Sequence, residues 1–244
     1  MMKKLTAVLL SLSLAGSFAN ASMLEVQGFA EKTYLVFKPQ ALSKLSLKLN
    51  DDQGKALGYF AAWQKQLSQC EELLFAMNAG MYHSDYTAVG LYIEKYQQLQ
   101  VLNKEQGSGN FFLQPNGVLA WNEKKAVVVQ TQDWEKQQFK AAYATQSGPM
   151  LVINGKIMSK FLPQSDSKKI RNGVGIKDGQ LYFVLSQQRV NFYEFAQFFK
   201  ENLGVEQALY LDGSISSIYA PSIKRHDRAY KLGPMLGYIQ NRCE

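Results

Sequence analysis

The chain has 244 residues, of which 46% are hydrophobic and 19% charged. This composition is typical of a globular protein and excludes a disordered, fibrous or coiled-coil chain. The length predicts one domain, or at most a tight pair. The net charge is +7, and it falls to +5 once Lys3 and Lys4 are removed with the leader described next. Such a modest excess, on an exported chain, argues against a nucleic-acid partner.

Residues 1–21 have the pattern of a signal peptide. Two lysines come first, a short apolar stretch from Leu5 to Ala15 follows, and Ala19-Asn20-Ala21 is a small-x-small cleavage pattern. The apolar stretch is shorter than the roughly 18–20 residues that cross a bilayer, which argues against a membrane anchor, and no later segment is long enough. We therefore expect cleavage after Ala21 and a periplasmic or secreted domain over residues 22–244.

The cysteine content fits an exported protein. Cys70 and Cys243 are the only cysteines, and an oxidising compartment allows them to pair and to fasten the C-terminal tail. Two separate buried thiols are the alternative, because so long a spacing says nothing about proximity. His83 and His226 are the only histidines, and their spacing does not predict a structural zinc site.

The first half of the chain is mostly strand in pattern. Strands are predicted at 34–37 and 45–49. Apolar residues at steps of three and four then predict a helix from Leu57 to Cys70. The run 71–77 predicts a buried strand that delivers Asn78 to a loop. Further strands are expected at 88–94, 98–102, 118–121 and 126–130.

Two hairpins and a helix dominate the second half. Asn154-Gly155 and Asp178-Gly179 favour tight turns, which predicts hairpins over 150–157 and 173–186. Asn191 with Glu194 forms a capping-box pattern at the start of a helix that ends before Gly204. Strands follow at 208–211 and 235–239. The whole pattern predicts an α+β fold, a single domain with a mixed, mainly antiparallel sheet core and a few flanking helices.

Three polar residues adjoin predicted buried strands and are candidates for chemistry. Asp212 follows the strand 208–211 and is either an acid/base or electrostatic group, or a turn aspartate that caps the backbone. Arg171 offers a planar fork for phosphate or carboxylate, or is a surface arginine. Asn78 offers hydrogen bonds to a sugar hydroxyl or an oxyanion, or is a turn residue.

Weaker signals surround these candidates. His83 and Asp85 are an acid/base pair or half of a metal site, although residues two apart in a loop need not face each other. Ser214, Ser216 and Ser217 raise the question of a serine hydrolase. However, the run from Gly213 lacks the second glycine of the G-x-S-x-G elbow, so that signal is weak.

The ordered set of motifs resembles the phosphodiester glycosidase family over roughly residues 70–240. The matching segments are Asn78-Ala79-Gly80-Met81-Tyr82, Ser147-Gly148-Pro149, Arg171-Asn172-Gly173-Val174-Gly175-Ile176 and Leu211-Asp212-Gly213-Ser214-Ile215-Ser216-Ser217. The chain departs from the family pattern at Ala79, at Asn172-Gly173 and at Ser214-Ile215. The resemblance therefore indicates an uncharacterised exported bacterial branch of the family.

The resemblance implies hydrolysis of a sugar from a sugar-1-phosphodiester, with a carbohydrate phosphodiester as substrate. In this reading Asp212 stabilises the oxocarbenium-like centre or positions a water, and Arg171 grips the phosphate with Lys168 or Lys169. Asn78 orients the sugar, and His83 is a reserve proton-transfer group partnered by Asp85. Further substrate-binding residues are Asn172, Gly213, Ser214, Ser216 and Ser217.

The same sequence leaves several points open. The resemblance implies no cofactor, while dependence on a divalent metal, stereochemical outcome, sugar identity and oligomeric state are not determined. The main alternative is a periplasmic module that binds an envelope glycan without turnover. A serine esterase is the third reading, and covalent labelling by a fluorophosphonate would reveal it.

Overall fold

The computed structural model describes residues 22–212 and 215–243. The predicted signal peptide and two candidate residues, Gly213 and Ser214, lie outside the described residues. The described strands form three sheets, and every pairing between them is antiparallel. The mainly antiparallel α+β fold expected from the sequence is therefore confirmed.

The largest sheet has seven strands in the order β1-β2-β13-β12-β14-β10-β11. Its strands are β1 (Leu24–Phe29), β2 (Lys32–Phe37), β10 (Met150–Ile153), β11 (Lys156–Ile157), β12 (Asn172–Lys177), β13 (Gln180–Ser186) and β14 (Gln207–Asp212). Both predicted hairpins belong to it. Their turn residues Asn154-Gly155 and Asp178-Gly179 all have positive φ, as the predicted tight turns require.

The other two sheets have five strands each. One has the order β16-β15-β4-β17-β3, and the other has the order β6-β5-β9-β7-β8. The first contains β3 (Leu45–Lys48), β4 (Glu71–Asn78), β15 (Ile218–Ala220), β16 (Arg225–His226) and β17 (Met235–Asn241). The second contains β5 (Tyr92–Glu94), β6 (Gln97–Gln100), β7 (Gly117–Trp121), β8 (Ala126–Gln130) and β9 (Tyr143–Ser147).

The described helices are short. They are α1 (Phe60–Gln64), α2 (Thr131–Trp134) and α3 (Phe192–Gln197), with 3-10 turns at Leu42–Lys44, Asn110–Phe112, Glu135–Gln137 and Pro221–Ile223. A π-helical turn, Phe198–Asn202, continues α3. Its phenylalanines pack in a buried cluster against β2, β13 and β14 and belong to the core.

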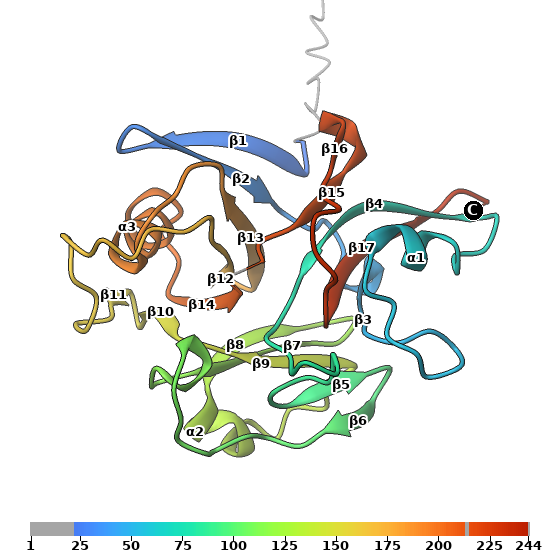
Figure 1. The fold of residues 1–244 in the computed structure, drawn as a ribbon, viewed down its shortest axis with the longest axis horizontal. Coiled ribbons are helices and arrows are strands. Elements are labelled where there is room, and N and C mark those ends of the chain that lie inside the picture. The colour runs from blue at the N-terminus through green and yellow to red at the C-terminus, as the bar shows by residue number, and fades with distance from the viewer. Residues whose placement is uncertain (1–21, 213–214, 244) are drawn as a thin grey trace, which may run out of the picture.

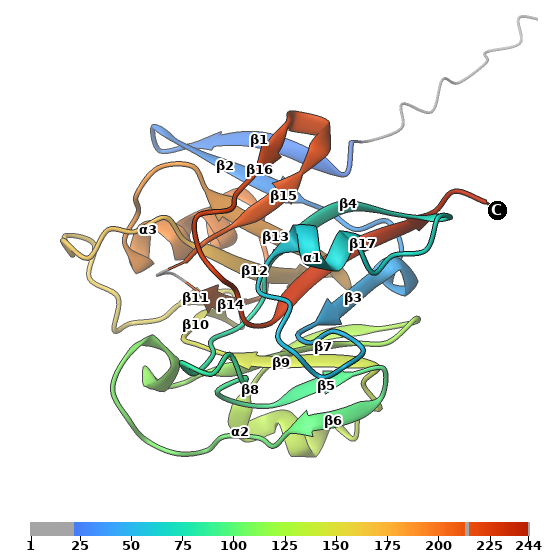
Figure 2. The ribbon, with the colours of Figure 1, turned by 45° about the vertical axis from the view of Figure 1, so that its right-hand side comes forward.

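One hydrophobic core joins all three sheets. Phe37 of β2 stacks on Phe75 of β4 with ring centroids 3.9 Å apart, and Trp121 of β7 and Leu209 of β14 belong to the same buried cluster. Figures 1 and 2 show the sheet of β5–β9 below the other two, which meet above it. Burial of this shared apolar surface holds the sheet edges in fixed positions relative to one another.

The helix predicted from Leu57 to Cys70 is shorter than expected. Leu57 lies in an extended segment, where its backbone N–H donates to the carbonyl of Leu49. Gly58 has a φ of +71°, which is not helical. Beyond Gln64 the chain continues in turns with i to i−3 hydrogen bonds, as from Leu67 to Gln64. The apolar face still packs as a cluster, so the spacing predicted the contacts correctly and the helix length wrongly.

Cys70 and Cys243 form a disulfide with their Cα atoms 5.3 Å apart. The bridge lies where β4 and β17 pair, because Glu71 faces Asn241 in the register. The alternative of two separate thiols is therefore wrong, and the C-terminal tail is fastened to the body as the paired reading expected. Within the described part of the chain, no helix is long and apolar enough to span a membrane.

Candidate functional site

The ends of four strands meet where two sheets join. In the seven-stranded sheet β12 and β14 are antiparallel, with Asn172 opposite Asp212, so the start of one strand lies beside the end of the other. In the neighbouring sheet β4 and β15 are also antiparallel, with Met77 opposite Ile218, so the end of β4 lies beside the start of β15. Three motif segments that are far apart in sequence therefore converge at one joint.

Asn78 is the centre of the hydrogen bonds at this joint. Its Nδ2 donates to Oδ2 of Asp212 at 3.2 Å, and its Oδ1 accepts from the backbone N–H of Ser217 at 2.8 Å. The side-chain amide of Asn172 donates to both Oδ1 and the backbone carbonyl of Asn78, at 2.9 and 2.8 Å. Asn172 Oδ1 in turn accepts from the backbone N–H of Asp212 at 2.9 Å. We call these four residues the polar joint.

This pattern leaves one orientation for the Asn78 amide. Two donors, from Ser217 and Asn172, face Oδ1, so Nδ2 must face the Asp212 carboxylate. Asn78 and Asn172 are fully buried, whereas Asp212 keeps 7% of its surface exposed. Side chains held this firmly fix the Asp212 carboxylate in one position.

The third sheet braces the backbone on either side of the polar joint. Ser147 Oγ of β9 donates to the carbonyl of Leu211 at 2.7 Å, and Thr145 Oγ1 donates to the carbonyl of Ala79 at 2.8 Å. Ser147 starts the Ser-Gly-Pro motif, so this segment also reaches the joint. Tyr82 lies close enough that burial, followed by the charges of Asp212 and Tyr86, raises the pKa of Tyr82 to about 12.

A cavity of about 600 Å³ opens beside the polar joint, with Ser216 and Ser217 in its wall. We call it the basic cavity because the lysine, arginine, histidine and carboxylate residues that line it are Lys169, Arg189, Arg225, His226, Asp227 and Arg228. Only Lys169 among these was predicted as a site residue. A volume in this range is ordinary for a small-ligand site.

Asp227 is the one carboxylate in this lining, and it is engaged. It pairs with Arg225 through both oxygens, at 3.1 and 2.9 Å, and its Oδ2 also accepts from the backbone N–H of Ile218 at 3.0 Å. The Arg228 guanidinium donates to Nδ1 of His226. Burial, and then the charge of Arg228, lowers the pKa of His226, while the charge of Asp227 opposes these effects.

Arg171 lies inside the protein and does not line the basic cavity. The side chain is 1% exposed, so the surface-arginine alternative is wrong. Its Nε donates to the carbonyl of Val190 at 2.9 Å, Nη1 to the hydroxyl of Tyr210 at 3.0 Å, and Nη2 to the carbonyl of Ser167 at 2.8 Å. The guanidinium also lies 3.8 Å from the ring centroid of Phe192. Burial lowers the pKa of Arg171, partly offset by Tyr210 and Glu194, yet an arginine stays charged.

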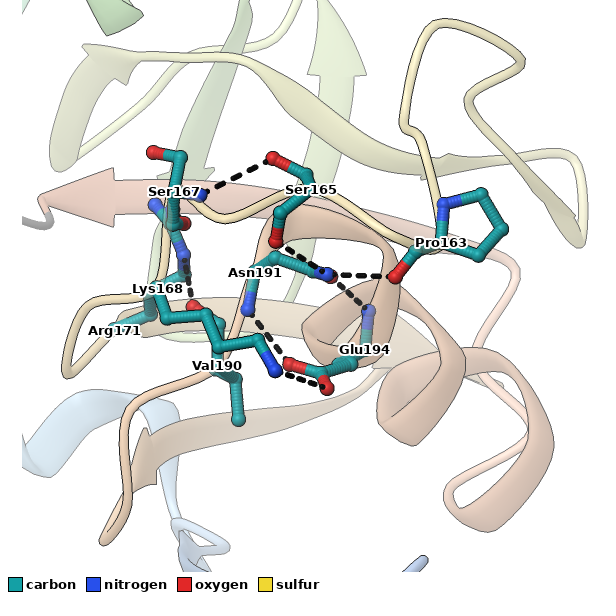
Figure 3. A network of polar contacts seen from close by, with 8 residues as sticks. All are labelled: Pro163, Ser165, Ser167, Lys168, Arg171, Val190, Asn191 and Glu194. Carbon is teal, nitrogen blue, oxygen red and sulfur yellow. Dashed lines mark hydrogen bonds and ion pairs between the residues drawn. The ribbon is translucent and has the colours of Figure 1, made fainter.

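Figure 3 shows how Arg171 and the start of α3 together hold the loop 163–171. Asn191 and Glu194 form the predicted capping box. The backbone N–H of Asn191 donates to the Glu194 carboxylate at 2.8 Å, and the backbone N–H of Glu194 donates to Asn191 Oδ1 at 2.9 Å. The Asn191 amide also donates to the carbonyls of Pro163 and Ser165. At the end of the loop, Lys169 and Val190 exchange two backbone hydrogen bonds. The loop 163–171 is thus firmly anchored.

Several predicted residues lie away from this centre. Lys168 points toward α3, where its Nζ lies 3.6 Å from Glu194. His83 and Asp85 are exposed, and His83 lines a separate hollow with Gln100 and Asn103. Asp85 Oδ1 accepts from the side chain and backbone of Thr87, which lower the pKa of that carboxyl.

The remaining predicted groups concern the serines and a metal. Ser216 Oγ donates to the backbone carbonyls of Ile170 and Asp212, both at 3.0 Å, which ties the β14–β15 connection to the loop 163–171. Across residues 22–212 and 215–243, no group of three or more His, Cys, Asp and Glu side chains is placed to hold a metal ion.

The model of the phosphodiester glycosidase family matches residues 71–231, a span that contains the whole polar joint. The uncharacterised protein YigE of Escherichia coli (strain K12) is 46% identical over 167 residues, which are 68% of this chain and 65% of that protein. This chain thus spans slightly less than two thirds of that relative. The chain belongs to the phosphodiester glycosidase family.

Two solved structures share the fold. The catalytic domain of zebrafish N-acetylglucosamine-1-phosphodiester α-N-acetylglucosaminidase, auto-inhibited by its pro-peptide, matches with a TM-score of 0.59 and 15% identity over 90% of this chain and 84% of that chain. A Burkholderia pseudomallei protein thought to be exported matches with a TM-score of 0.51 and 11% identity, over 84% and 73%. At these identities the likeness shows the fold.

Proposed function

We propose that this chain is an exported hydrolase that cleaves a sugar-1-phosphodiester to a free sugar and a phosphate monoester. The observation that carries the proposal is the convergence of the family motifs on Asp212, in a polar joint whose Ser217 also lines a cavity rich in cations. The disulfide between Cys70 and Cys243 supports a location outside the cytoplasm.

The proposed reaction needs the two features that this site combines, a carboxylate and a nearby group of cations. The bond that breaks joins the anomeric carbon to the phosphate oxygen, and the phosphate monoester leaves with the bonding electron pair. Water supplies the hydroxyl that the anomeric carbon gains and releases one proton. A phosphate monoester is a good leaving group, so the reaction needs less proton donation than an ordinary glycoside and more stabilisation of charge.

In this proposal Asp212 either stabilises the positive charge that develops at the anomeric carbon or accepts the proton of the attacking water. Asn78 donates to one carboxylate oxygen of Asp212, and the backbone N–H of Asp212 donates to the side-chain oxygen of Asn172. Lys169 faces the leaving phosphate from the basic cavity. Ser216 and Ser217 help to orient the substrate.

Two roles implied by the resemblance change in the light of the geometry. Arg171, enclosed by Val190, Tyr210 and Ser167, acts in our proposal as a positioning residue for the loop that carries Lys169. His83 is exposed and is not among the residues of the basic cavity, whereas His226 is one of them. His226 therefore replaces His83 as the proposed auxiliary proton-transfer group.

Sugar release from a panel of sugar-1-phosphodiesters tests the proposal. We expect Asp212→Asn, which keeps the side-chain shape and removes the charge, to lower kcat/KM by about a thousandfold or more. Asp178→Asn is the matched control, because it makes the same change in the exposed hairpin turn of β12 and β13 and should leave turnover at the wild-type level. Mass spectrometry of the free sugar, with and without chelator, provides the readout.

Each of three results would count against the proposal. Full activity in Asp212→Asn would remove Asp212 from the reaction. Glycan binding by the folded wild-type protein without any sugar release would instead identify a non-catalytic binding module. Covalent labelling by a fluorophosphonate would point to the esterase reading.

A further inference from the structure

The basic cavity carries more positive charge than one phosphodiester requires. Four cationic side chains line it, and Asp227 is the single carboxylate among its residues. Asp227 is paired with Arg225, whereas Lys169, Arg189 and Arg228 form no ion pair with any carboxylate of residues 22–212 and 215–243. A phosphodiester bears one negative charge, so these three cations exceed what a lone phosphodiester neutralises.

The cations come from two walls whose backbones are fixed. On one wall the two hydrogen bonds between Lys169 and Val190 place Lys169 next to the segment that carries Arg189. On the other wall β15 and β16 pair through Tyr219 and His226, which places Arg225 and Arg228 in the hairpin and the segment after it. Cations held on two separate segments that line one cavity favour an anionic ligand that contacts both segments.

The cavity is also larger than a phosphodiester group with a small alcohol would fill. The cavity has a volume of about 600 Å³, and Ser216 and Ser217 form the part of its wall that belongs to the β14–β15 connection. Tyr230, which is 56% exposed, also lines the cavity. A phosphodiester group with a small alcohol occupies only part of such a space. The leaving half of the substrate is therefore the part for which this cavity offers both room and charge.

We propose that the leaving half of the substrate bears a second anionic group, a phosphate in the first instance, that binds between Arg189 and Arg228. The substrate class is then a sugar-phosphate chain with repeated negative charges rather than an isolated phosphodiester. This inference rests on the proposed function, since it assigns the basic cavity to the leaving half of that substrate.

A matched pair of substrates tests this assignment. Both carry the same sugar-1-phosphate, esterified in one case with methanol and in the other with 3-phosphopropanol, which adds a second phosphate. We expect kcat/KM to be at least about tenfold higher for the 3-phosphopropyl ester at low ionic strength, and salt to reduce this preference. The double variant Arg189→Gln/Arg228→Gln should bring the ratio of the two kcat/KM values close to one.

Lys124→Gln/Lys125→Gln is the matched control. It removes the same charge from the exposed turn between β7 and β8, away from the basic cavity, and should keep the wild-type ratio. Equal kcat/KM for the two esters in the wild type would overturn the inference while the proposed function stands. An unchanged preference in the arginine variant, or its loss in the lysine control, would overturn it as well.

A binding measurement decides the case in which neither ester is hydrolysed. Isothermal titration calorimetry with inorganic phosphate and with tripolyphosphate reports on the basic cavity without turnover. We expect tripolyphosphate to bind at least about tenfold more tightly than phosphate, and the arginine double variant to remove that difference. Equal affinities in the wild type would overturn the inference independently of any catalytic result.

Discussion

Replacing Asn78 with Asp is expected to abolish sugar release and to destabilise the fold. The amide nitrogen that donates to Asp212 at 3.2 Å becomes an oxygen, while the donors from Ser217 and Asn172 hold the other oxygen in place. Two carboxylates then face each other at a buried joint, where they cannot both be charged at low cost. We expect kcat/KM to fall at least about a thousandfold, and the free energy of unfolding to fall by about 3 kcal/mol.

This variant should also acquire a characteristic pH dependence. The repulsion raises the pKa of the carboxylate pair in the folded state above that of the unfolded chain. A raised pKa stabilises the folded state at low pH, and that stabilisation is lost as the pH rises through the folded value. Urea unfolding should therefore show a smaller deficit relative to wild type near pH 5 than near pH 8.

Asn202→Asp is the control for this prediction. It makes the same chemical change at an exposed position, where the amide bonds only Gln27, and we expect activity and unfolding midpoint close to wild type at both pH values. A folded Asn78→Asp protein with normal turnover would show that the polar joint does not hold the reacting group.

Replacing Arg171 with Lys is expected to weaken the fold and substrate binding more than the chemical step. One ammonium cannot reproduce three bonds to Val190, Tyr210 and Ser167 from a planar fork. At a site that is 1% exposed, we expect a loss of about 2–3 kcal/mol in the free energy of unfolding. The loop that presents Lys169 should loosen, which raises KM.

Steady-state kinetics separate this positioning role from direct contact with the phosphate. We expect KM of Arg171→Lys to rise about tenfold while kcat changes by less than about threefold. A fall in kcat of a hundredfold or more with unchanged KM would instead indicate that Arg171 acts on the transition state. Arg242→Lys, at an exposed ion pair with Glu72, is the control and should alter neither constant.

Strand periodicity and turn chemistry made much of this fold predictable. The runs that end at Asn78 and at Asp212 are apolar because both strands are buried, and the Asn-Gly and Asp-Gly turns match their hairpins. The short strands β15 and β16 carry too few residues for a clear pattern, and they were not predicted. The strand β9 was also missed, because polar Thr145 and Ser147 serve as hydrogen-bond donors in its buried interior.

The candidate site was predictable in its centre and not at its edges. The sequence placed Asn78, Asn172 and Asp212 at strand ends, but only the strand register within each sheet and the contact between the two sheets bring them together. The burial of Arg171 has no sequence signal, since an arginine before a glycine-rich strand reads as a ligand for anions or as a surface residue. The charged run from Arg225 to Arg228 was not predicted as part of the site, because its place beside Ser217 depends on the β15–β16 hairpin.

The position of bond cleavage tests the central claim most directly. Hydrolysis of a sugar-1-phosphodiester in water enriched in oxygen-18 labels whichever atom the water attacks. If the chain is a phosphodiester glycosidase, attack occurs at the anomeric carbon, and mass spectrometry should find no label in the phosphate monoester. Label in the phosphate, or release of sugar-1-phosphate and free alcohol, would show attack at phosphorus and would contradict the role proposed for Asp212.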